Sequence, residues 1–177
     1  MVSLDILLHE LAQSPVHNAL ILDGEAFRSA NTVATCDSPH TDLLKTASIV
    51  CEYGDLFVPC GLSALWVHGI ISEPQRHTVA MRSLKRSTFA TQNLFDVRDY
   101  GSLSGKTIDL GGFAVVRVHA ALEQVLRDPR IDEVQLQNVL VAVSWQVPKL
   151  LAEVHTSLAK YHRVPYTELA LQRISLR

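Results

Sequence analysis

The sequence has no uninterrupted apolar run of about 18 residues, the length that a helix needs to cross a bilayer. Its first ten residues contain no Lys or Arg and are interrupted by Asp5 and Glu10, so no secretory signal is expected. Cysteine is scarce as well: Cys36, Cys51 and Cys60 are odd in number and form no C-x-x-C pair. We therefore expect a cytoplasmic protein with free thiols and no membrane partner.

Glycine and proline are also sparse, at eight and seven of 177 residues, which excludes collagen-like and linker-like sequence. A chain that is 47% hydrophobic and only 19% charged is not intrinsically disordered. Its length suits about one domain with a core of its own. We expect three parts: a helix and loop segment over 1–40, an α+β region over 41–127, and a helical segment over 128–177.

Hydrophobic periodicity indicates the secondary structure. Helical spacing predicts helices over 3–13, 41–53, 63–68, 119–127, 132–145, 148–158 and 167–174. A short strand followed by an Asp-Gly turn is expected over 19–24, a loop over 28–40, and a buried strand over 56–58. A period near two predicts strands over 77–82, 86–91, 94–98, 106–110 and 113–118. The expected fold class is α+β, with a small, mainly antiparallel sheet flanked by helices and a helical C-terminal third.

Charge is unevenly distributed along the chain. Residues 1–75 contain two basic and nine acidic residues, whereas residues 76–177 contain fourteen basic and nine acidic residues. One stretch of eleven residues gathers Arg76, His77, Arg82, Lys85 and Arg86 with no acidic residue among them. These five residues are the candidate contacts for DNA or for an acidic protein surface. A basic, solvated hairpin that balances the acidic first part is the alternative interpretation.

Catalytic patterns are weak. The eight histidines include no H-E-x-x-H pair, so neither a metal nor a cofactor is expected. Asp96, Asp99 and Lys106 resemble the carboxylate and lysine sets of magnesium-dependent nucleases, which makes a degenerate nuclease one alternative. Cys60 and His68 are of the residue types of a nucleophile and its base, but nothing else in the sequence supports that role, and a buried structural cysteine is the expected interpretation.

A resemblance to a known family rests on the stretch from Leu62 to Ile70, which reads Leu-Ser-Ala-Leu-Trp-Val-His-Gly-Ile. It resembles a helix signature in the C-terminal region of AbiEi-type antitoxins and related transcriptional regulators. The similarity covers about residues 43–127, with a helix before the signature, a basic strand after it, and a valine-rich strand that leads into a helix. The family's Ser-Pro-x-Arg-Thr step at that last junction is replaced here by His119 and the residues after it.

The resemblance implies a non-enzymatic regulator that represses its own promoter and neutralises a nucleotidyltransferase-like toxin. Relatives read DNA with an N-terminal winged helix, but residues 1–40 contain only one basic residue, Arg28, and give no convincing winged helix. The function expected from the sequence is therefore a regulatory protein that binds nucleic acid or a cognate toxin through the basic strand region. A protein-interaction module that uses helices 132–161 is the remaining alternative.

Overall fold

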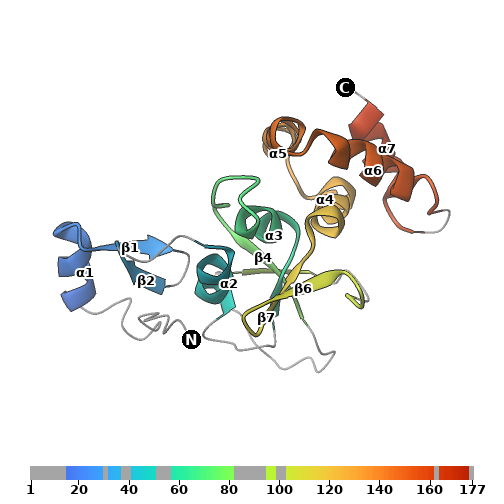
Figure 1. Ribbon diagram of the computed structural model, residues 1–177. Coiled ribbons are helices and arrows are strands. Elements are labelled where there is room, and N and C mark those ends of the chain that lie inside the picture. The colour runs from blue at the N-terminus through green and yellow to red at the C-terminus, as the bar shows by residue number, and fades with distance from the viewer. Residues whose placement is uncertain are drawn as a thin grey trace.

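The computed structural model describes residues 15–29, 32–36, 41–50, 57–81, 95–98, 103–161 and 164–175. Within these ranges the chain forms helices and small sheets, so the expected α+β fold class is confirmed. Figure 1 shows the N-terminal elements at one end of the molecule, the sheet near the middle and the C-terminal helices at the opposite end. No helix in the described part of the chain is long and apolar enough to cross a membrane.

The first elements differ from the expectation. Residues expected to form a strand before the Asp-Gly turn belong to helix α1 (Pro15–Leu22), which Asp23 extends by donating its backbone N–H to Ala19 O. Proline suits the first turn of a helix because its missing N–H has no partner there. The expected loop over 28–40 instead contains part of an antiparallel hairpin, β1 (Ala26–Ser29) with β2 (Thr32–Thr35). The helix expected over 3–13 lies outside the described residues.

The central sheet is mixed. Strand β3 (Phe57–Pro59) pairs antiparallel with β4 (His77–Met81), and β4 pairs in parallel with β5 (Phe95–Arg98). Strands β6 (Thr107–Leu110) and β7 (Phe113–Val116) form a separate antiparallel hairpin. The described residues therefore contain small separate sheets rather than a single sheet of four or five strands. The strand expected over 86–91 lies outside them.

Helices cover these strands, and their positions follow the expected pattern. They are α2 (Asp42–Val50), α3 (Gly61–Val67), α4 (Val118–Arg127), α5 (Glu133–Gln146), α6 (Pro148–Leu158) and α7 (Thr167–Ser175). Asp132 caps α5 by accepting a hydrogen bond from Gln135 N at 2.8 Å, and Pro148 opens α6.

A single hydrophobic cluster joins the sheet to the C-terminal helices. Its buried members run from Ile49 in α2 to Ala170 in α7, and they include Leu122 of α4 and Leu140 of α5. The residues expected as separate segments, 41–127 and 128–177, thus contribute to one core. This shared core fixes α5 and the turn before it relative to the sheet.

Candidate functional site

The basic strand region begins at Arg76, which the structure places at the surface just before β4. Its Nη2 donates a hydrogen bond to Phe95 O at 3.3 Å, which ties the start of β4 to the start of β5. Arg82, Lys85 and Arg86 lie outside the described residues. Binding by these residues as a group therefore stays a prediction.

His77, the remaining candidate contact, is buried instead of exposed. Its ring packs against Trp66, with the two ring centroids 5.1 Å apart. Ser63 Oγ lies 3.1 Å from His77 Nδ1, and Glu73 Oε1 lies 3.3 Å from Nε2. Burial lowers the pKa of His77, and Glu73 opposes this shift by charge and by hydrogen bonding. A neutral imidazole that donates through Nε2 to Glu73 and accepts at Nδ1 fits these contacts.

Ser63 connects α3 to β4 through two hydrogen bonds. Its fully buried hydroxyl accepts the N–H of Thr78 at 2.7 Å, so its own proton is available to His77 Nδ1. The Ser63–His77–Glu73 order looks like a hydrolytic triad, but no exposed surface of Ser63 faces solvent for a substrate to approach. Its place in the structure is a packing contact between helix and strand.

Most of the other residues of the Leu62–Ile70 signature are buried in the core. Lys45 Nζ donates to Trp66 O at 3.2 Å and lies 5.8 Å from the centre of the Trp66 ring. His68 Nε2 lies 2.9 Å from Val116 O, which joins α3 to β7. Gly69 has a φ of +73°, the left-handed conformation that glycine adopts at low cost after a helix.

The expected nucleophile and base are not paired in the structure. His68 directs a ring nitrogen to Val116 O, and Cys60 is completely buried between β3 and α3. Burial raises the pKa of the Cys60 thiol well above its usual value, chiefly by desolvation, and the charge of Arg98 opposes that shift. A reactive cysteine needs a lowered pKa, so Cys60 has the properties of a structural residue.

The two described residues of the nuclease alternative, Asp96 and Lys106, lie in different elements. Asp96 forms an ion pair with Arg98 within β5, Lys106 is exposed in the turn before β6, and Asp99 lies outside the described residues. Among the residues that the structure describes, no group of three or more His, Cys, Asp or Glu side chains is placed to hold a metal ion.

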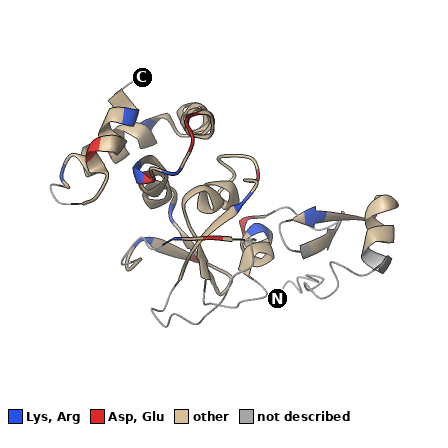
Figure 2. Ribbon diagram, turned by 180° about the vertical axis from the view of Figure 1, so that it is seen from behind, with Lys and Arg blue, Asp and Glu red and all other residues tan. Residues whose placement is uncertain are grey.

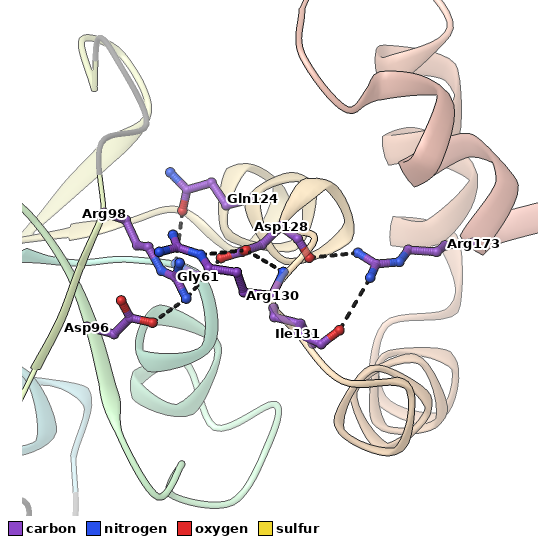
Figure 3. A network of polar contacts seen from close by, with 8 residues as sticks. All are labelled: Gly61, Asp96, Arg98, Gln124, Asp128, Arg130, Ile131 and Arg173. Atoms are coloured by element: carbon purple, nitrogen blue, oxygen red, sulfur yellow. Dashed lines mark hydrogen bonds and ion pairs between the residues drawn. The ribbon is translucent and has the colours of Figure 1, made fainter.

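A buried polar network connects β5 to the turn between α4 and α5 (Figure 3). Arg98 Nη2 contacts Asp96 and also Asp128 Oδ2, the latter at 3.3 Å, and the Asp128 side chain is only 4% exposed. Asp128 Oδ1 in turn accepts hydrogen bonds from the backbone N and the Nε of Arg130, at 3.0 and 3.3 Å. From α7, Arg173 reaches the same turn and donates to the backbone carbonyls of Leu126, Asp128 and Ile131.

A hollow of about 570 Å³ opens beside this network. Four cationic side chains line it, together with two acidic ones: Arg98, Lys106, Arg127 and Arg130, with Glu123 and Asp128. Basic and acidic residues lie close together where α4 ends (Figure 2). Sequence reasoning missed this site because Arg98 reads as an ordinary strand residue and Asp128-Pro129 as a helix stop.

The outer side of α5 is a second unusual surface. Val134, Val141 and Trp145 are 73%, 46% and 84% exposed, although the opposite side of this helix is buried. Their spacing of seven and four residues places them along one face, which we call the outer α5 face. A groove of about 550 Å³ runs between α5 and the loop before β4, with Glu73 and Asp132 as its charged lining residues.

Comparison with protein families and with curated proteins finds no relative of this chain. The resemblance to AbiEi-type antitoxins therefore stays a prediction.

Proposed function

We propose that this protein is a non-enzymatic regulatory protein that acts by binding another protein, as its resemblance to AbiEi-type antitoxins implies. The observation that carries the proposal is the outer α5 face formed by Val134, Val141 and Trp145. A surface helix that buries one side normally presents polar residues on the other. Aromatic side chains such as Trp145 are also the residues that contribute most to protein–protein contacts.

The groove beside this face indicates what kind of surface the partner presents. Its lining combines apolar side chains of α5 and α3 with the carboxylates of Glu73 and Asp132, and it includes no Lys or Arg. A partner that places apolar residues against Trp145 and a Lys or Arg near the two carboxylates would complement it. The occupant we propose is the protein encoded beside this one, as expected for an antitoxin and its toxin.

The test is binding of the purified neighbouring gene product, measured by titration calorimetry. The double variant Val141→Ser and Trp145→Ser removes two of the three apolar residues of the outer α5 face. Leu22→Ser is the matched control, because Leu22 is an 87% exposed apolar residue on α1. We expect the double variant to weaken binding at least tenfold and the control to leave it unchanged, since one well-packed aromatic anchor contributes about 2 kcal/mol or more.

Two results would contradict the proposal. Equal affinity for the wild type and the double variant would show that the outer α5 face is not the contact. Concentration-dependent self-association that the double variant abolishes would assign the face to a second copy of this chain instead.

Binding of nucleic acid through the basic strand region is the second candidate. It is supported by the exposed position of Arg76 and by the basic run that follows Met81 in the sequence. Contacts to phosphates weaken steeply as salt rises, so binding to the protein's own upstream DNA is measured across a salt series. Reversal of charge at Arg76, Arg82, Lys85 and Arg86 is expected to abolish binding and leave the far-UV spectrum unchanged. Unaltered binding would refute the assignment.

A further inference from the structure

The geometry points to an anion site in the hollow beside Arg98, where the phosphate group of a small phosphorylated ligand binds. This inference goes beyond the proposed function, because the hollow lies at the ends of β5 and α4 and shares no lining residue with the outer α5 face or its groove. Figure 3 shows Arg98 and Arg130 converging on Asp128 at this place.

The guanidinium of Arg98 carries the inference. Its side chain is only 7% exposed, and both of its ion pairs, to Asp96 and Asp128, use the same nitrogen, Nη2. Nε and Nη1 are buried and have no hydrogen-bond partner among the described residues. Those two nitrogens carry three N–H groups. Buried donors on a charged group are rarely left without acceptors, so a ligand with several acceptor oxygens fits this place.

Further cations surround the hollow at different depths. Lys106 is exposed at its edge, and Arg130 is 62% exposed while its Nε contacts Asp128. Arg127, which also lines the hollow, donates through its Nε to Pro165 O at 3.0 Å. The carboxylate of Asp128 accepts from both Arg98 and Arg130, and so it fixes the positions of these two cations. The other N–H groups of the two guanidinium groups are left to bind a phosphate dianion.

The size of the hollow and its apolar and aromatic lining residues indicate a ligand larger than a free anion. A volume of about 570 Å³ lies within the range of pockets for small organic ligands. Val164, Pro165 and Tyr166, from the segment before α7, also line the hollow, and Tyr166 is 57% exposed. An aromatic ring there offers a stacking surface for a planar organic group such as a nucleobase. We therefore expect a ligand with a phosphate at Arg98 and a flat group at Tyr166.

Titration calorimetry with the full chain tests this inference with three probes: inorganic phosphate, adenosine 5′-monophosphate and adenosine. Because Arg98→Gln disrupts a buried network and can prevent folding, the main variant is Lys106→Gln with Arg130→Gln, which changes exposed side chains only. Lys149→Gln with Lys160→Gln removes the same charge from exposed positions outside the hollow and is the matched control.

We expect the wild type to bind inorganic phosphate saturably and to bind the monophosphate more tightly. In the main variant both affinities should be at least about tenfold weaker, and in the control both should be unchanged. Tyr166→Ala is expected to weaken the monophosphate and leave inorganic phosphate unaffected. Equal affinity for phosphate and monophosphate would assign the site to free phosphate and overturn the role of Tyr166. No saturable phosphate binding, or an equal loss in the control variant, would overturn the site. Binding of the neighbouring gene product tests the outer α5 face, so a failure of that proposal can be told apart from a failure of the anion site.

Discussion

Replacement of Ser63 by alanine tests how α3 is attached to the sheet. The hydroxyl is fully buried, accepts the N–H of Thr78 at 2.7 Å and lies 3.1 Å from His77 Nδ1. Alanine cannot replace either contact, so a backbone donor and a ring acceptor are both left buried without a partner. A buried polar group that loses its partner costs about 1–3 kcal/mol.

Two opposing effects reduce the total loss of stability expected for Ser63→Ala. Alanine favours helix more than serine does, which returns a few tenths of a kcal/mol within α3. The ring of His77 can also exchange its tautomer, although its other nitrogen is already engaged with Glu73. We therefore expect the free energy of unfolding to fall by about 2–4 kcal/mol, a large part of the roughly 5–15 kcal/mol that typical domains possess.

Urea denaturation followed by far-UV circular dichroism measures this change. Ser175→Ala is the matched control, because Ser175 Oγ donates only to Leu171 O within an exposed part of α7. We expect the control to stay within about 0.5 kcal/mol of the wild type. A loss below about 0.5 kcal/mol for Ser63→Ala would refute the argument that this hydroxyl joins α3 to β4.

Three further predictions address other parts of the molecule. Burial lowers the folded-state pKa of His77, so the unfolded chain binds the extra proton more readily. The free energy of unfolding should therefore fall as pH drops below about 6.5, by at most about 1.4 kcal/mol per pH unit. In urea titrations at several pH values, His77→Gln should remove this slope. Cys60 has a raised pKa and is completely buried, so it should resist a disulfide reagent until the protein unfolds. Exposed Cys36 should react in the native state. Mass spectrometry of the labelled peptides distinguishes the two cysteines. Gly111→Ala should destabilise the protein more than Gly105→Ala in thermal unfolding. Both glycines have positive φ, so alanine adds a strain of about 1 kcal/mol at either position. Only at Gly111 would the new methyl group also meet a side chain, that of Leu43 in α2, at 2.9 Å.

The sequence allowed much of the helical structure to be predicted. Helices α2 and α4 to α7 follow an apolar stripe of helical period, and several of their ends have a local signal such as Asp132 or Pro148. These signals depend on neighbours along the chain, so they are readable without tertiary structure. The error at α1 has the same origin, because an apolar run of four residues before Asp23-Gly24 fits either a strand or the end of a helix.

Strand direction and burial could not be predicted in this way. A period near two located β4 and β5 but says nothing of whether the two run parallel. His77 stood next to Arg76 in a basic stretch and was expected at the surface. Because β4 lies between β3 and β5 and is covered by α3, most of this strand is buried, and His77 with it.

The anion site was invisible for a different reason. Arg98, Asp128 and Arg173 come from β5, the α4–α5 turn and α7, and they meet only once the chain has folded (Figure 3). Nothing in the residues around Arg98 distinguishes it from the other arginines of the basic second half. Only the fold shows that its guanidinium is buried.

The same turn lies between the two surfaces for which we propose binding. Asp128 accepts from Arg98 through its carboxylate and from Arg173 through its backbone carbonyl, and α5 begins five residues later. Arg98 therefore holds the sheet, and Arg173 holds α7, against the segment that positions the outer α5 face.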